Sequence, residues 1–282
     1  MATATVTQAH TNNSDANFRL WGKWISDQLA AWGWTKTSDS GQINWATVTA
    51  PVGTSAVQGY EVWSLGDALQ ATAPVKVKIE YGSGSNVNWP STWVTIGSTS
   101  DGAGNITGPQ TARKQVANNS HSTTGVPSHA AGGTSWATFC IWDTSTSGWT
   151  FVMERTKDAS GADTAYGFNV ALVEANAGIF WQQTYVIGVS PMPAEASIAC
   201  LLPSSGTLTK GGVVQLSAVF PIDGNWLNPF LTALCGFAAN LTASTTVSFN
   251  MYGASHTYFV SSQSCNCTKS NVGGVVMLIL YE

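Results

Sequence analysis

The chain has 282 residues, of which 44% are hydrophobic and only 9% are charged, whereas about 25% of the residues in a typical globular protein are charged. Its formal net charge of −4 leaves no basic surface to neutralise a nucleic-acid backbone, and its hydrophobic content excludes an intrinsically disordered chain. The polar character comes from Ser, Thr, Asn, Gln and 28 Gly, mixed with 13 Trp. This composition favours a protein that packs among its own copies.

The chain ends and the cysteines indicate where the protein is made. Residues 1–17 lack the basic start and apolar stretch of a signal peptide, and the longest apolar run, Val275–Tyr281, is far shorter than the roughly 20 residues of a membrane helix. We expect synthesis in a cytoplasm, no membrane contact, and an N-terminal arm over 1–17. The five cysteines are interpreted as mostly reduced core residues. A bridge from Cys265 or Cys267, within the chain or to a neighbour, is the alternative.

One amphipathic helix is predicted near the N-terminus. Asn13, Ser14 and Asp15 are good N-cap residues, and Gly33 stands where a helix ends. Between them, apolar residues recur at helical spacing: Phe18, Trp21, Ile25, Leu29 and Trp32. This stripe either covers the chain's own β-core or docks on a neighbouring subunit. In the second case the candidate assembly contacts are Phe18, Trp21, Trp24 and Ile25.

After Gly33 the pattern changes to short β-type runs. Strands are predicted over Tyr60–Leu65, Val75–Tyr81 and Trp93–Ile96, which are rich in β-branched and aromatic residues. In the second run four apolar residues alternate with Lys76, Lys78 and Glu80. That alternation predicts a strand with one buried and one wet face.

Residues 97–135 are rich in Gly, Ser, Thr and Asn and are predicted to form a loop or arm. Gln110–Gly133 within it is interpreted as a mobile surface loop, as an arm ordered by neighbouring subunits, or as a loop that grips a ligand. Arg113 and Lys114 are its candidate assembly contacts.

Strand patterns return after residue 135. The predicted strands are Trp136–Trp142, Trp149–Glu154, Ala165–Glu174, Gly178–Ile187, Ile198–Leu202, Val213–Phe220, Thr245–Tyr252, His256–Val260 and Val275–Tyr281. Leu227–Ala239 suits a buried helix or a buried strand. More than about ten short strands with turns between them predict a mainly β fold, an antiparallel β-sandwich or jelly-roll-like architecture with one N-terminal amphipathic helix. We expect 136–282 to form one compact body with 18–96.

Motifs for catalysis or cofactor binding are missing from the sequence. It contains no P-loop, no Gly-x-Ser-x-Gly and no His-Glu-x-x-His, and its four histidines are scattered, so we expect no enzyme, no metal and no cofactor. The densest charge cluster comprises Glu154, Arg155, Lys157, Asp158 and Asp163. It is interpreted as a solvated turn that protects a strand edge. The alternative is a pair of carboxylates for hydrolysis of a polysaccharide.

Several tryptophans lie beside turn-like sequence and are candidates for stacking on a sugar ring: Trp89, Trp93, Trp149 and Trp226. Exposed at a surface, they would support a module that binds a host glycan. Packing in the core or at a subunit contact is the alternative, because aromatic residues dominate both places.

Four blocks of sequence together resemble a family of virion proteins of tailed bacteriophages. They are Phe18–Gly33, Lys36–Ile43, Leu69–Gly82 and Asp101–Gly108, and the resemblance covers about residues 18–108. Members of that family are mostly called virion or tail-associated proteins, and the resemblance brings no catalytic residues with it. It implies a non-enzymatic virion component located in the tail or the neck-to-tail region, with copies of itself and other virion proteins as partners. A head decoration protein and a module that binds a host glycan are the alternatives.

Overall fold

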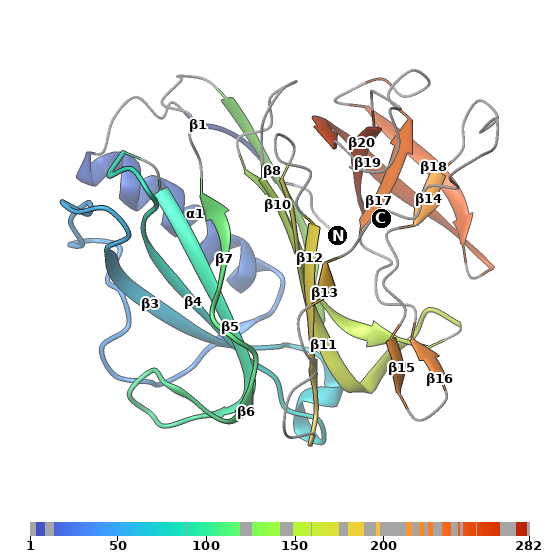
Figure 1. Cartoon of the computed structure of the whole chain (residues 1–282), viewed down its shortest axis with the longest axis horizontal. Coiled ribbons are helices and arrows are strands. Elements are labelled where there is room, and N and C mark those ends of the chain that lie inside the picture. The colour runs from blue at the N-terminus through green and yellow to red at the C-terminus, as the bar shows by residue number, and fades with distance from the viewer. Residues whose placement is uncertain are drawn as a thin grey trace.

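The protein is described here by a computed structural model. The described residues are 4–8, 14–88, 90–118, 126–141, 149–158, 160–174, 180–188, 196–197, 213–215, 220–222, 225–227, 233–237, 242, 245–251, 253–265 and 275–280. The fold is mainly β, with antiparallel sheets and one N-terminal helix, as the sequence predicts. The sheets are open and lie in layers across the molecule (Figure 1).

The helix α1 (Asp15–Ala31) begins and ends where its sequence indicates. The Ser14 side chain caps it by accepting a hydrogen bond from the Asn17 amide, and Gly33 leaves the helix with a φ of +87°, a conformation that glycine adopts without strain. Phe18, Trp21, Ile25 and Leu29 are all buried. The apolar stripe therefore covers the chain's own core, which was the first of the two interpretations.

A first sheet lies against α1. It has the order β2-β3-β4-β5-β6, with β7 paired to β5 as well. Its strands are β2 (Thr35–Lys36), β3 (Val57–Ser64), β4 (Lys76–Ser83), β5 (Pro90–Ser100), β6 (Ile106–Gln110) and β7 (Lys114–Asn118), and a short 3-10 helix, η1 (Ala68–Ala71), precedes β4.

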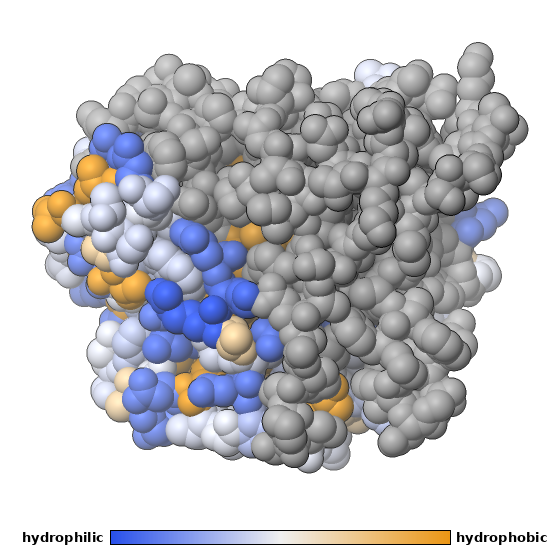
Figure 2. Space-filling view, viewed as in Figure 1, coloured by the Kyte–Doolittle hydropathy of each residue, from blue (hydrophilic) through white to orange (hydrophobic). Residues whose placement is uncertain are grey.

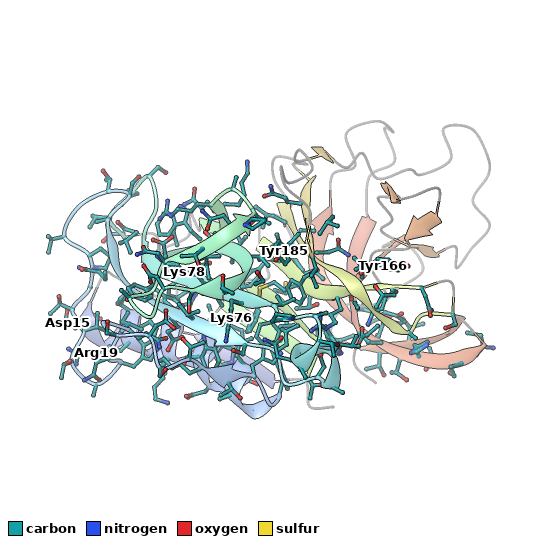
Figure 3. All side chains as sticks on the ribbon, turned by 90° about the horizontal axis from the view of Figure 1, so that it is seen from below. Asp15, Arg19, Lys76, Lys78, Tyr166 and Tyr185 are labelled. Carbon is teal, nitrogen blue, oxygen red and sulfur yellow. The ribbon has the colours of Figure 1, made fainter. Side chains whose placement is uncertain are left out.

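Strand β4 shows how this sheet separates its two faces. Val77, Ile79 and Tyr81 are fully buried, whereas Lys76 and Lys78 are half-buried on the opposite side. Figure 3 shows α1 beneath the sheet, and Figure 2 shows hydrophilic residues gathered over its outer face. The alternation in the sequence is therefore confirmed.

A second sheet forms the middle layer, with the order β1-β8-β9-β10-β11-β12-β13. Its strands are β1 (Ala4–Gln8), β8 (Val126–Gly133), β9 (Trp136–Ile141), β10 (Trp149–Lys157), β11 (Asp163–Glu174), β12 (Phe180–Val186) and β13 (Ala196–Ser197). Phe139 of β9 packs against Trp24 and Trp32 from the α1 side, with ring centroids 5.6 and 5.5 Å away. One hydrophobic core is continuous from α1 through the first sheet to this one.

A third sheet packs on the far side of the middle layer, where the rings of His129 and Phe259 lie 4.6 Å apart. Its order is β14-β17-β20-β19-β18. Its strands are β14 (Val213–Gln215), β17 (Ala233–Phe237), β18 (Thr246–Met251), β19 (Ala254–Cys265) and β20 (Val275–Leu280), and β15 (Phe220–Ile222) pairs with β16 (Asn225–Leu227) beside it. The ambiguous stretch Leu227–Ala239 thus contributes a strand, β17.

The sequence predicts a loop or arm over 97–135, but most of its described residues form the end of β5 and strands β6, β7 and β8. Residues 119–125 lie outside the described residues. The pattern was hidden because small residues replace the usual apolar ones: Ala130 and Ala131 are buried, and a Cβ on Gly132 would lie 2.1 Å from the Trp32 ring. Within the expected arm over 1–17, Ala4–Gln8 pairs with β8 and α1 begins at Asp15, while 1–3 and 9–13 lie outside the described residues.

Candidate functional site

The richest cluster of polar side chains in the described part of the chain surrounds the carboxylate of Glu61 on β3. Glu61 is fully buried. Its Oε1 accepts hydrogen bonds from Ser26 Oγ at 2.9 Å, Lys36 Nζ at 2.6 Å and Trp45 Nε1 at 3.1 Å. Its Oε2 accepts from Tyr81 OH at 2.9 Å and Trp63 Nε1 at 3.3 Å. We call Glu61 and these five donors the Glu61 cluster.

Four different elements and one turn bring the cluster together. Ser26 comes from α1, Lys36 from β2, Trp63 from β3 beside Glu61 itself, and Tyr81 from β4. Trp45 comes from the turn after β2 and reaches the cluster across α1 at Gly22, where a Cβ would lie 2.0 Å from its ring. Gly22, which is unfavourable within a helix, is thus the position over which Trp45 lies.

The geometry of the cluster assigns it a structural role. A carboxylate has about four lone-pair positions, and five donors already point at this one. Burial, and after it the neighbouring Glu61 carboxylate, raises the pKa of Tyr81 well above its ordinary value, so Tyr81 stays protonated and keeps donating. No acceptor position is left to take a proton from a substrate, and the cluster joins α1 to the first sheet.

A second polar cluster surrounds Asp39 and joins the loop after β2 to the turn between β5 and β6. Asp39 Oδ1 accepts from Thr37 Oγ1 at 2.6 Å and from Ser100 Oγ at 2.9 Å, and Oδ2 accepts from the Gly104 amide at 3.0 Å. Burial alone would raise the pKa of Asp39, but these hydrogen bonds together outweigh it and hold the pKa below its ordinary value. The clustered carboxylate is therefore ionised and holds the two loops together.

The turn that faces Asp39 is itself ordered by a carboxylate. Asp101 accepts hydrogen bonds from the Asn105 side chain at 2.7 Å and from the Ala103 amide at 2.8 Å, and these bonds lower its pKa. Tyr60 OH, on β3, donates to the Ser40 carbonyl at 2.5 Å and lies 2.8 Å from the Ala103 carbonyl. The hydroxyl is thus held between both loops.

The charge cluster of the second sheet departs from the expected solvated turn. Glu154, Arg155 and Lys157 are buried on β10, whereas Asp158 is exposed and Asp163 half-buried at the turn. Arg155 Nε pairs with Asp67 Oδ2 at 2.7 Å, and its Nη2 donates to the Ala73 carbonyl at 3.1 Å.

The burial of Arg155 has a physical reason. Buried charges occur where they are paired, and the partner of Arg155, Asp67, is remote in sequence. Asp67 lies just before η1, so this ion pair ties the first sheet's connection to the middle layer.

The candidate assembly contacts fall into two groups. Phe18, Trp21, Trp24 and Ile25 are at most 7% exposed, so they belong to the chain's own core and not to an outer surface. Arg113 is exposed and pairs with Glu80 at 2.6 Å, and Lys114 is half-buried at the start of β7. Assembly contacts through these two residues stay a prediction.

The four tryptophans that are candidates for stacking on a sugar differ in their surroundings. Trp93 on β5 is only 7% exposed, and the guanidinium of Arg113 lies over its ring, 4.5 Å from the centroid. The expectation that its face is open to a sugar is therefore corrected. Trp149 and Trp226 belong to β10 and β16, but their side chains are outside what is described, as is all of Trp89, so these three stay predictions.

Within the described ranges, no three His, Cys, Asp or Glu side chains gather closely enough to hold a metal ion. Cys140 is a buried thiol, Cys265 ends β19, and Cys267 lies outside the described residues. No helix in the described part of the chain is long and apolar enough to span a membrane.

Glu61, Asp39 and Asp67 were not singled out in the sequence. A signal for Glu61 existed. In the predicted strand Tyr60–Leu65, Glu61 has the same period-two spacing as Trp63 and Leu65, which places its side chain on the face that those two residues bury. Asp39 and Asp67 lie in loops, where nothing local indicates burial.

Neither the models of known protein families nor the curated protein sequences contain a match to this chain.

Proposed function

We propose that the chain is a non-enzymatic structural component of a tailed phage virion, present in many copies in the tail or the neck-to-tail region. Its role there is assembly, with copies of itself and other virion proteins as partners. The support comes from the arrangement of the sequence blocks that resemble tailed-phage virion proteins.

Those blocks are separated in sequence but touch in the folded chain. Phe18–Gly33 is α1 with its terminal turn, and Lys36–Ile43 supplies both Lys36 to the Glu61 cluster and Asp39 to the second cluster. Asp101–Gly108 holds Gly104, which donates to Asp39, and Gly102, whose carbonyl accepts from the Ser40 amide at 2.8 Å. The resemblance therefore rests on residues that contact one another in the folded chain. Such contacts support the proposal better than a similar composition would.

The chemistry of the described clusters also suits a structural role. The Glu61 carboxylate has its acceptor positions filled by donors of the chain itself. Buried polar groups that are satisfied by the chain itself make a protein rigid and its packing specific. A rigid body is what a repeated subunit contributes to a symmetric particle.

The test is whether the protein is part of the particle. Particles of the phage that encodes the chain are purified on a density gradient, digested and analysed by mass spectrometry, and antibodies against the purified protein are used for immunogold electron microscopy. We expect peptides of the chain at a multi-copy level and gold label on the tail or neck. Label on the head surface would instead favour a decoration protein, and absence of the peptides from the particles would overturn the proposal.

A further inference from the structure

Among the described strands, β18 is the terminal strand of the third sheet, at the right of Figure 1 on the side opposite α1. Natural sheets protect such edges with charged residues, prolines or bulges, because an open edge pairs readily with another chain. β18 reads Thr-Val-Ser-Phe-Asn-Met and has none of these. Between Asp223 and Lys269 the sequence contains no Asp, Glu, Lys or Arg at all.

The pairing with β19 shows which main-chain groups of β18 point outward. The Val260 amide donates to the Thr245 carbonyl at 2.8 Å, so Thr245 and Val260 form a hydrogen-bonded pair. Hydrogen-bonded and non-hydrogen-bonded pairs alternate along an antiparallel ladder. Thr246, Ser248 and Asn250, which pair with Phe259, Thr257 and Ser255, therefore direct their N–H and C=O groups away from β19.

The same three residues are also the exposed ones. Thr246, Ser248 and Asn250 are all exposed, whereas Val247 between them is half-buried. The edge thus presents a row of main-chain donors and acceptors together with short, uncharged, hydrogen-bonding side chains.

We propose that β18 pairs antiparallel with β18 of a second copy of this chain, about a two-fold axis at Ser248. Ser248 then lies opposite Ser248 of the other copy, and Thr246 lies opposite Asn250. All three residues exchange main-chain hydrogen bonds in this register, and the two third sheets become one continuous sheet. The inference rests on the proposed assembly role, since it names a surface through which copies meet.

The charge pattern supports a second copy as the partner. In a two-fold contact the residue on the axis meets its own copy, so a charge at position 248 would face the same charge. An edge without charge is therefore suited to pairing with itself. Three other strands at sheet edges are less suited: β2 has two residues, β6 contains Pro109 and β7 begins with Lys114.

A cysteine at the axis tests the register directly. Opposed Cα atoms of a hydrogen-bonded antiparallel pair are about 5.5 Å apart, which is within disulfide range. Ser248→Cys is therefore expected to give a disulfide-linked dimer on a non-reducing gel after mild oxidation, above any background of the wild-type protein. Ser255→Cys, which is equally exposed but one strand inward, is the matched control and should stay unlinked. Absence of linking in Ser248→Cys, or equal linking in the control, would overturn the proposal.

A charge at the axis tests the association itself. The mass of the wild-type protein by light scattering, under reducing conditions, is expected to be an even multiple of the 29.6 kDa chain. Ser248→Lys should halve it, because two lysines then face each other, while Ser255→Lys should leave it unchanged. Equal melting temperatures would show that both variants fold.

A monomeric wild-type protein, or a Ser248→Lys variant that keeps its mass, would contradict the proposed β18 contact. Neither result would bear on the presence of the chain in particles, so failure of this contact and failure of the proposed function are distinguishable.

Discussion

At the scale of single residues, the Glu61 carboxylate organises donors from both α1 and the first sheet. Replacing it by glutamine keeps the shape but places an amide NH₂ where only acceptors serve, so at least one buried donor loses its partner and the attraction to Lys36 disappears. We expect Glu61→Gln to lower the free energy of unfolding by about 3 kcal/mol. Urea unfolding followed by tryptophan fluorescence measures this loss.

The matched control is Asp27→Asn on α1, which makes the same change from carboxylate to amide. Asp27 and its partner Lys23 are both more than half exposed, and exposed ion pairs contribute about 0.5 kcal/mol. A loss at Glu61 no larger than that at Asp27 would show that the cluster contributes little to stability.

The Asp39 carboxylate gives the protein a pH dependence of defined sign. Its pKa is lowered in the folded protein, so folding favours the ionised form. This contribution is fully present at neutral pH and is lost as the pH falls below 3.8, the ordinary value. Between pH 7 and about pH 3, the wild-type protein should therefore lose more unfolding free energy than Asp39→Asn, which cannot titrate at this position.

The measurement is a series of urea titrations of both proteins across that range. Asp158, whose pKa is also lowered, titrates in both proteins and cancels in the comparison. Parallel curves would mean that the hydrogen bonds to Asp39 do not favour its ionised form.

At the scale of elements, the contact between α1 and the turn that carries Trp45 depends on Gly22. Alanine would favour the helix by about 1 kcal/mol, but its methyl group would lie 2.0 Å from a ring that is fixed by Glu61 and packs on Tyr81. Overpacking costs about 1–3 kcal/mol, so we expect Gly22→Ala to be destabilising overall, by up to about 2 kcal/mol.

Gly53→Ala is the control for that substitution. A Cβ at Gly53 would meet no atom closer than 3.9 Å, so this change should be neutral or stabilise by about 0.4–1 kcal/mol through the unfolded chain. Thermal and urea unfolding of the two variants should move in opposite directions. A stabilised Gly22→Ala variant would mean that the Trp45 ring shifts at no cost.

How far the elements could be predicted depended on their side chains. The helix was predictable because large apolar residues such as Phe18 and Leu29 mark its buried face and Ser14 and Gly33 its ends. Strand β4 was predictable from strict alternation. Strand β8 was not, because its buried residues include Ala130 and Gly132, the latter beneath the Trp32 ring, and a small residue's burial depends on the large neighbour that covers it. The Glu61 cluster joins residues from 26 to 81, so its donors could not be assembled from local pattern.

At the scale of the whole molecule, contacts between the layers are more specific than hydrophobic packing alone. Trp34 Nε1 donates to the Gly133 carbonyl at 2.9 Å, and the Gly66 amide donates to the Thr134 carbonyl at 2.9 Å. Both bonds join the segments beside the first sheet to the turn between β8 and β9. The buried pair of Arg155 and Asp67 lies at the same junction and fixes how the two sheets sit on each other.

That pair supports a prediction about the cooperativity of the molecule. Asp67→Asn leaves the Arg155 guanidinium, which has no exposed surface, without its counter-charge, and such losses cost about 3–5 kcal/mol. Because the pair joins two layers that share one core, we expect tryptophan fluorescence and far-UV circular dichroism to shift together along the urea axis. The double variant Asp67→Leu with Arg155→Met, which removes both charges, should lose less than Asp67→Asn alone. Separated transitions in the single variant would show that the layers unfold independently, and a double variant as unstable as the single one would show that packing around the pair matters more than its charge.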